Sequence, residues 1–169
     1  MDFPYATFED VLSANEEYAK HFTDEGLGGR AARGLALVTC MDSRIDPLAM
    51  LGMSAGDMKI IRNAGARVTD DVLRTLVLAV HLLGVRRILV VPHTNCKMAS
   101  GDDSSVHDAL SQATGLDTRW MDIGTTPDQV GALHHGLTRI RTMPYIPSDI
   151  VVAGAIYDVF TGRLDPLDL

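Results

Sequence analysis

Three short and almost continuous apolar runs constrain the fold of this chain more than any other feature. They span residues 35–39, 58–61 and 87–91, and none alternates regularly as a strand with one solvated face would. Such runs are typical of strands in a parallel sheet that is covered on both faces. A helical pattern at 70–83 separates the second run from the third, with Thr69 as its expected N-cap and a glycine as its stop.

Other elements are expected on either side of these runs. Helical periodicity at 7–22 predicts an amphipathic helix with Thr7 as its N-cap, and a second helix is expected at 126–141 with Pro127 at its first position. A strand is expected at 150–159, followed by a hairpin turn and a short fifth strand. Strands that alternate with helices predict a doubly wound α/β sheet, which takes its ligands at the carboxyl ends of the strands.

Length and charge narrow the class of protein. A chain of 169 residues has the usual size of one domain, and we expect a single domain over 1–169. Its 15 basic and 22 acidic residues leave a net charge of -7, which argues against sequence-independent nucleic-acid binding and a polybasic membrane anchor. No apolar stretch is long enough to cross a bilayer, and the first residues do not resemble a secretory signal. We therefore expect a cytoplasmic protein with reduced thiols.

The sequence contains two cysteines, and each follows a predicted strand. Cys40 comes directly after the run at 35–39, whereas Cys96 follows the run at 87–91 and lies three residues beyond His93. The carboxyl ends of parallel strands open into one crevice, so these side chains can converge there. Two thiolates and one imidazole form a ligand set that is typical of catalytic zinc, with a fourth position left for water or substrate.

Other interpretations of these residues stay open at this point. A lone cysteine is commonly a small buried hydrophobe, and two neighbouring cysteines can form a redox pair without any metal. Asp42 and Arg44 lie beside Cys40 at the mouth of the expected crevice. They are either part of a site or an ordinary ion pair on the surface.

Three short motifs follow the predicted strands: Cys40-x-Asp42-x-Arg44, Arg62-Asn63-Ala64-Gly65 and His93-Thr94-x-Cys96. Their order and spacing resemble those of the β-class carbonic anhydrases. The similarity extends from about residue 7 to residue 164 and is greatest to the short bacterial members.

The resemblance implies which residues would form the site. It implies that Cys40, His93 and Cys96 hold one zinc ion per chain, and that Asp42 and Arg44 form a catalytic dyad. In some members of the family the aspartate becomes a fourth zinc ligand in a closed state, so Asp42 is a candidate for that position too.

The resemblance also implies an architecture and an assembly. The expected sheet has four parallel strands and an added antiparallel strand, with helices on both faces. The expected assembly is an obligate homodimer, or a tetramer, with sites at the subunit interface. The predicted helix at 7–22 would then pack on the partner subunit.

The activity implied is reversible hydration of carbon dioxide to bicarbonate and a proton, by attack of zinc-bound hydroxide. Zinc with two thiolates and one neutral imidazole has a net charge of about zero, so its water needs help to become a nucleophile. Asp42 can help by accepting a hydrogen bond from that water, with Arg44 keeping the carboxylate ionised. A carbonyl sulfide or carbon disulfide hydrolase with the same ligands stays open as an alternative, as does a non-catalytic zinc-binding homologue.

Lys97 departs from the family pattern, which usually has glycine after the second cysteine. If the backbone there had a positive φ, lysine would cost roughly 1–2 kcal/mol more than glycine. In ordinary geometry at a helix start it would cost little. Its ammonium group either makes the zinc-bound water more acidic or is simply solvated.

Overall fold

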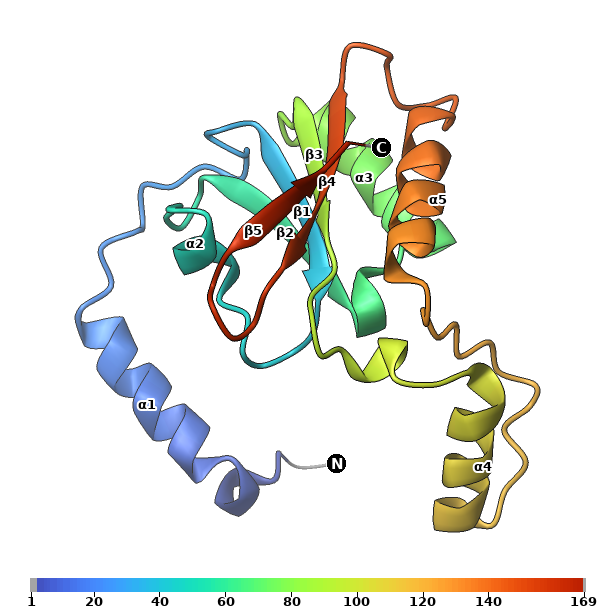
Figure 1. Ribbon diagram of the computed structural model, residues 1–169. Coiled ribbons are helices and arrows are strands. Elements are labelled where there is room, and N and C mark those ends of the chain that lie inside the picture. The colour runs from blue at the N-terminus through green and yellow to red at the C-terminus, as the bar shows by residue number, and fades with distance from the viewer. Residues whose placement is uncertain (1–2, 169) are drawn as a thin grey trace.

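The predicted strands form one five-stranded sheet in the computed structural model, which describes residues 3–168 (Figure 1). The strands are β1 (Leu35–Cys40), β2 (Met58–Asn63), β3 (Arg87–Val91), β4 (Val151–Tyr157) and β5 (Leu164–Leu167). They lie in the order β2-β1-β3-β4-β5, with β5 antiparallel to β4 and all other neighbours parallel. The expected architecture of four parallel strands with one antiparallel addition is therefore confirmed.

The burial of each strand follows from its place in the sheet. β1 is central and buried at every position, as its continuous apolar run predicts. β2 lies at an edge, where Met58 is buried but Ile60 is exposed. An apolar run can therefore belong to an edge strand when one of its faces remains uncovered.

Helices cover the two faces of the sheet unequally. Helices α3 (Asp70–Leu82) and α5 (Gln129–Arg141) pack on one face, against Ala36 and Val38 of β1. The opposite face, which carries Leu35 and Leu37, packs against the short helix α2 (Pro47–Met50) and the residues that follow it. The sheet thus has helices on both sides and opens at the carboxyl ends of its strands.

Two predicted helices begin later than expected. The segment around Thr7 forms a 3-10 turn, and α1 (Glu9–Lys20) starts after Phe8, which makes no side-chain cap, so the predicted cap at Thr7 is wrong. α5 is capped by Asp128, whose carboxylate accepts from the Gly131 amide, so Pro127 precedes the cap instead of opening the helix. In contrast, Thr69 caps α3 by accepting from Val72, as predicted.

Helix α4 (Asp103–Thr114) was not predicted from the sequence. Its side chains are mostly polar and His107 is its one buried residue, so the apolar periodicity that indicates a helix is weak. Its two ends do carry recognisable signals. Asp102 accepts from the Ser105 amide at 2.8 Å, and Gly115 ends the helix in the left-handed conformation.

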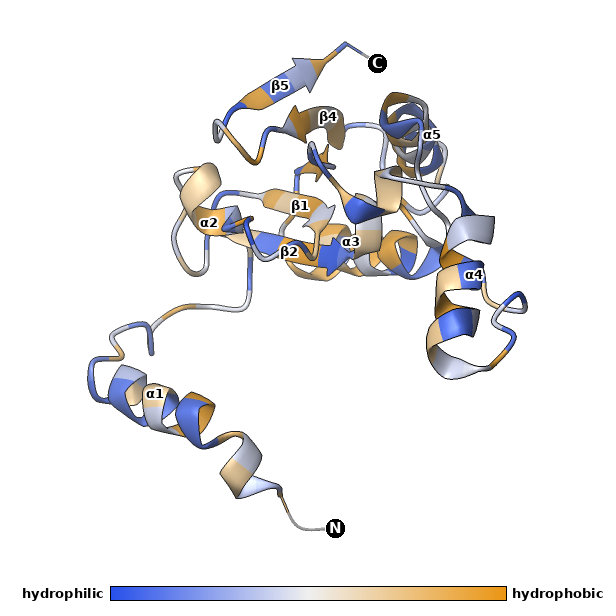
Figure 2. Ribbon diagram, turned by 60° about the horizontal axis from the view of Figure 1, so that its bottom comes forward, coloured by the Kyte–Doolittle hydropathy of each residue, from blue (hydrophilic) through white to orange (hydrophobic). Residues whose placement is uncertain are grey.

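Helices α1 and α4 extend away from the sheet on different sides (Figures 1 and 2). No residue of α1 is buried, although several of its apolar side chains share one face. Within residues 3–168, no helix combines the length and apolar character that a membrane span requires.

Candidate metal centre

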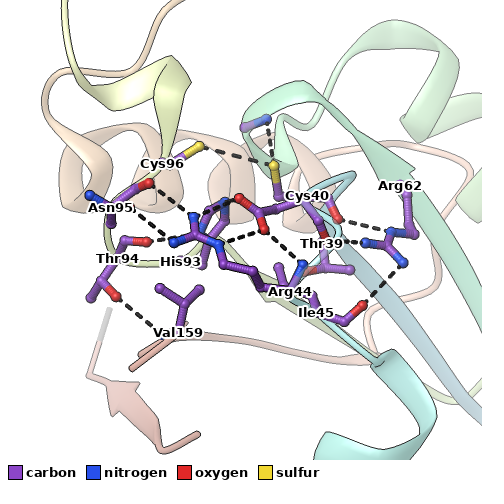
Figure 3. A network of polar contacts seen from close by, with 12 residues as sticks. Thr39, Cys40, Arg44, Ile45, Arg62, His93, Thr94, Asn95, Cys96 and Val159 are labelled. Carbon is purple, nitrogen blue, oxygen red and sulfur yellow. Dashed lines mark hydrogen bonds and ion pairs between the residues drawn. The ribbon is translucent and has the colours of Figure 1, made fainter. Parts of the chain in front are cut away.

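Cys40, His93 and Cys96 meet at the carboxyl end of the sheet (Figure 3). Cys40 is the last residue of β1, and the other two lie in the loop after the neighbouring strand β3. One donor atom from each residue lies within 4.8 Å of the others, and all three residues are buried. The convergence expected for strand ends in a parallel sheet is therefore observed.

The ring of His93 is oriented with one nitrogen available. Its Nδ1 lies 2.8 Å from the carbonyl oxygen of Thr94, so Nδ1 carries the proton and donates it. Its Nε2 is buried and has no hydrogen-bond partner among the described residues. A lone pair that is buried beside two thiols fits a metal ligand, because such a nitrogen otherwise loses its hydrogen bond to water.

The two cysteines are free thiols whose sulfurs lie 4.0 Å apart. Burial raises the pKa of the Cys96 thiol, and the neighbouring Cys40 raises it further. The Gly65 amide approaches the Cys40 sulfur at 3.4 Å. A bound cation would reverse the preference of Cys96 for its neutral form, because metals bind cysteine as the thiolate. Two sulfurs and one imidazole nitrogen form a soft donor set that fits zinc.

Asp42 and Arg44 form a bidentate pair beside these donors. Arg44 donates from Nε to Oδ1 of Asp42 at 2.9 Å and from Nη2 to Oδ2 at 2.7 Å. These hydrogen bonds hold the pKa of Asp42 well below its usual range. Oδ2 of the same carboxylate lies 3.8 Å from Nε2 of His93. The pair is thus directed at the donor cluster, unlike an isolated surface ion pair.

Two residues that sequence reasoning left without a role support this arrangement. Arg62 on β2 donates to the backbone oxygens of Cys40 at 2.9 Å, Asp42 at 2.7 Å and Ile45 at 3.3 Å. Asn95 accepts a hydrogen bond from Arg44 at 3.0 Å. The position of Arg62 at the end of a strand beside β1 was a usable signal, whereas nothing in the sequence marks the contact of Asn95.

The Asn63-Ala64-Gly65 segment forms a tight turn next to the thiols. The side chain of Asn63 bonds both the amide and the carbonyl group of Arg67, each at 2.8 Å. Gly65 has a φ of 83°, a value that glycine adopts without steric cost, and its amide approaches the Cys40 sulfur. The turn therefore brings backbone close to the donor cluster.

A pocket of about 520 Å³ opens beside Cys96 and is also lined by Asp42, Arg44 and Lys97. Lys97 is exposed and opens a short 3-10 helix, Lys97–Ala99. It is not among the non-glycine residues with positive φ in the described chain. The glycine that is usual in the family is therefore not required here by the backbone conformation.

Comparisons with known proteins agree with this geometry. A family model described as "Carbonic anhydrase" matches residues 35–132. Beta-carbonic anhydrase 1 of Mycobacterium tuberculosis is 36% identical over 157 residues, which cover 93% of this chain and 95% of that protein. The crystal structure of carbonic anhydrase from Streptococcus mutans, also 36% identical, superposes with a TM-score of 0.89 over 99% of this chain and 100% of that one.

A protein named for another activity is also similar to this chain. Carbon disulfide hydrolase of Acidithiobacillus thiooxidans is 29% identical over 188 residues, which cover 94% of this chain and 85% of that protein. The region matched by the family model includes the three buried donor residues and the Asp42–Arg44 pair. With identity of 36% across nearly the whole length of a relative, the chain belongs to the β-carbonic anhydrase family.

Proposed function

We propose that this protein catalyses the reversible hydration of carbon dioxide to bicarbonate and a proton, with zinc as its cofactor. The observation that carries this proposal is the buried cluster of Cys40, His93 and Cys96, whose unpartnered nitrogen lies 3.8 Å from the carboxylate of Asp42. An ionised carboxylate beside a soft donor set is what activation of a water molecule requires.

Cys40, His93 and Cys96 would hold one Zn²⁺ per chain. The fit rests on the sulfurs 4.0 Å apart and on the His93 tautomer, which leaves Nε2 able to coordinate. When bound, zinc supplies the Lewis acidity that lowers the pKa of a water molecule to about 7. Two thiolates neutralise the charge of the ion, so residues around the site must contribute the rest of the activation.

Asp42 is the group that we assign to the attacking water. Its carboxylate is ionised near neutral pH, and Arg44 keeps it ionised in more acidic solution too by holding its pKa well below the usual range. It can therefore accept a hydrogen bond from the water and direct an oxygen lone pair at the carbon of the substrate. Arg44 keeps the carboxylate charged and fixes its orientation through two parallel hydrogen bonds.

The proposed reaction forms one bond and releases one proton. The water oxygen bonds to the carbon of carbon dioxide, one carbon–oxygen double bond becomes single, and a proton passes to solvent to leave bicarbonate. The pocket of about 520 Å³ beside Asp42 and Arg44 leaves room for this small substrate.

Hydrolysis of carbon disulfide or carbonyl sulfide is the second candidate activity. It is favoured by the similarity to carbon disulfide hydrolase of Acidithiobacillus thiooxidans and by the chemistry, since water attacks a linear electrophilic carbon in each case. The donor set and the Asp42–Arg44 pair serve both reactions equally.

The deciding experiment measures metal content and activity on the same purified protein. We expect one zinc per chain by elemental analysis, and fast carbon dioxide hydration in a stopped-flow assay with a pH indicator. Faster turnover of carbon disulfide or carbonyl sulfide would favour the second activity. Zinc without turnover of any of these substrates would indicate a non-catalytic zinc protein, and absence of zinc would favour a redox pair of cysteines.

We further propose a homodimer in which α1 packs on the partner subunit, with a tetramer as the alternative assembly. Helix α1 has no buried residue, yet it carries the exposed apolar side chains Val11 and Tyr18, and Phe8 and Phe22 are exposed just beyond its two ends. An uncovered apolar face on a projecting helix is suited to a subunit interface. We also propose a cytoplasmic location, where a reducing environment keeps both cysteines as thiols.

A further inference from the structure

Asn95 contacts the Nη1–Nη2 end of the Arg44 guanidinium, next to the edge that faces Asp42. Arg44 donates from Nη1 to the side-chain oxygen of Asn95 at 3.0 Å and from Nη2 to its backbone oxygen at 3.2 Å (Figure 3). The same guanidinium donates to Asp42 from Nε and Nη2. Arg44 thus joins the loop after β1, which carries Asp42, to the loop after β3, which carries Asn95.

We infer that Asn95 is a positioning residue, which fixes the plane of the Arg44 guanidinium and thereby keeps the Asp42 carboxylate directed at Arg44. The catalytic meaning of this role rests on the proposed function, whereas the contacts themselves do not. Asn95 lines the same pocket as Asp42 and Arg44, and the role that we infer for its side chain acts through Arg44.

The Asp42 carboxylate needs such support because it has a second possible position. Its Oδ2 lies 3.8 Å from Nε2 of His93, in a place where a bound cation would attract it. Among the described residues, the hydrogen bonds that oppose that movement come from Arg44, through its backbone amide at 2.9 Å and through its guanidinium, and the Arg44 side chain is 40% exposed. Free rotation of such a long side chain would weaken its hold on the carboxylate, so an anchor at the Nη1–Nη2 end of the guanidinium preserves the pair.

The backbone conformation of Asn95 makes it possible to test its hydrogen bond separately from its effect on the backbone. Asn95 has a φ of 55°, in the left-handed region that asparagine tolerates better than most residues other than glycine. Glycine would satisfy this backbone at least as well but would offer no side-chain acceptor to Arg44. Alanine would lack the acceptor and also strain the backbone.

Three variants test the inference: Asn95→Gly, Asn95→Ala and Asn95→Asp. Each would be loaded with cobalt(II), whose visible spectrum reports anion binding, and titrated with thiocyanate. In Asn95→Gly and Asn95→Ala, the released Asp42 carboxylate would turn toward the metal and compete with thiocyanate for it. We therefore expect both variants to bind thiocyanate more weakly by up to about tenfold, which is the effect of losing one charge-assisted hydrogen bond. We expect Asn95→Ala, but not Asn95→Gly, to unfold at a lower temperature than the wild type.

Crystal structures of the zinc-loaded variants give the direct readout. In Asn95→Gly, we expect Arg44 to leave its position and the Asp42 carboxylate to turn toward the metal. Asn95→Asp should keep Arg44 in place, because aspartate retains an acceptor and tolerates the left-handed backbone. This third variant is judged by structure alone, since its added charge would itself repel thiocyanate.

The outcomes distinguish this inference from the proposed function. Unchanged thiocyanate affinity in Asn95→Gly, with Arg44 still paired to Asp42 in the crystal, would overturn the role of Asn95 even in an active enzyme. A loss confined to Asn95→Ala would overturn it as well, because backbone strain would then be the cause. Neither readout requires turnover, so a wild-type protein without hydration activity would contradict the proposed function alone.

Discussion

The hydrogen bond from His93 to the Thr94 carbonyl oxygen fixes which ring nitrogen carries the proton and which is left as a possible ligand. A carbonyl oxygen can only accept, so the contact between Nδ1 and the Thr94 oxygen places the proton on Nδ1 and the lone pair on Nε2. Gln129 donates to the backbone oxygen of His93 at 2.9 Å from a position 36 residues further along the chain. Ring and backbone are both fixed, and no sequence pattern reveals either contact.

At this scale the sharpest prediction concerns Asp42→Asn. The amide keeps the size of the side chain but removes the negative charge that would orient the attacking water. We expect kcat/KM for carbon dioxide hydration to fall by about a hundredfold or more, as for the loss of a general acid–base group. Zinc content should stay unchanged, since Cys40, His93 and Cys96 remain. Stopped-flow kinetics and elemental analysis on the same sample measure both.

Asp149→Asn is the matched control for this substitution. Asp149 is exposed and lies in the turn before β4. It is therefore at the amino ends of the parallel strands, whereas the donor cluster is at their carboxyl ends. The substitution changes the net charge of the protein in the same way and should leave kcat/KM unchanged. An Asp42→Asn enzyme with activity within twofold of this control would remove Asp42 from the mechanism.

Among the elements, α4 is attached to the loop that follows by His107, Asp108 and Asp103, and Asp103 makes the most of these hydrogen bonds. Asp103 accepts from the amide of Gly124 at 3.1 Å, from the amide of Thr125 at 2.7 Å and from the hydroxyl of Thr125 at 2.6 Å. These hydrogen bonds, the Thr125 hydroxyl first, lower the pKa of Asp103 from its ordinary value of 3.8. The ionised form of Asp103 therefore stabilises the folded chain.

Asp103→Asn should accordingly lower the free energy of unfolding at neutral pH. A carboxyl whose pKa is lower in the folded state contributes its stability above pH 3.8 and loses it as pH falls through the lowered value. The difference between wild type and variant should therefore narrow in acid. Urea unfolding at pH 7 and in steps below pH 4 measures this, and a difference that widens in acid would contradict the assignment.

The elements differ in how far the sequence predicts them, and the reasons are physical. The central strands β1 and β3 are buried on both faces, so their continuous apolar runs mark them almost to the residue. The start of α5 is shifted because the Asp128 carboxylate caps the helix, which leaves Pro127 before the cap and not at the first helical position. α4 buries a single residue and so leaves little apolar periodicity to detect.

The candidate site was more predictable than the loops that hold it. Cys40 and Cys96 stand at strand ends, where topology alone brings residues together. The contacts that orient them are of another kind. Arg62 reaches three backbone oxygens, and Asn95 depends on a left-handed φ, which sequence patterns for strands and helices do not encode.

For the whole molecule, α1 is the element that its own chain leaves uncovered (Figure 2). Val11 and Tyr18 of α1 stay exposed, whereas the sheet-facing apolar side chains of α3 and α5, such as Leu76 and Leu137, are buried. A single chain therefore leaves an apolar helix face in water, which a second copy would cover in the dimer that we propose.

A pair of charge substitutions on α1 tests this assembly. Val11→Glu places a charge on the exposed apolar face, whereas Ser13→Glu places the same charge on the polar side of the helix. We expect Val11→Glu to raise the dimer dissociation constant by about tenfold or more, since burying an unpaired charge is costly, and Ser13→Glu to have little effect. Sedimentation velocity over a range of concentrations measures both, and equal behaviour would argue against α1 as the interface.

The proposed metal site also has a consequence for the unfolded chain. Cys40 and Cys96 are 56 positions apart in sequence, although their sulfurs nearly touch in the fold. A cation that both hold would close a long loop and reduce the entropy of the unfolded state, which for a covalent cross-link of this span corresponds to about 4 kcal/mol. Loss of the metal would then lower the thermal stability of the protein as well as remove its activity, so its melting temperature would depend on the concentration of available zinc.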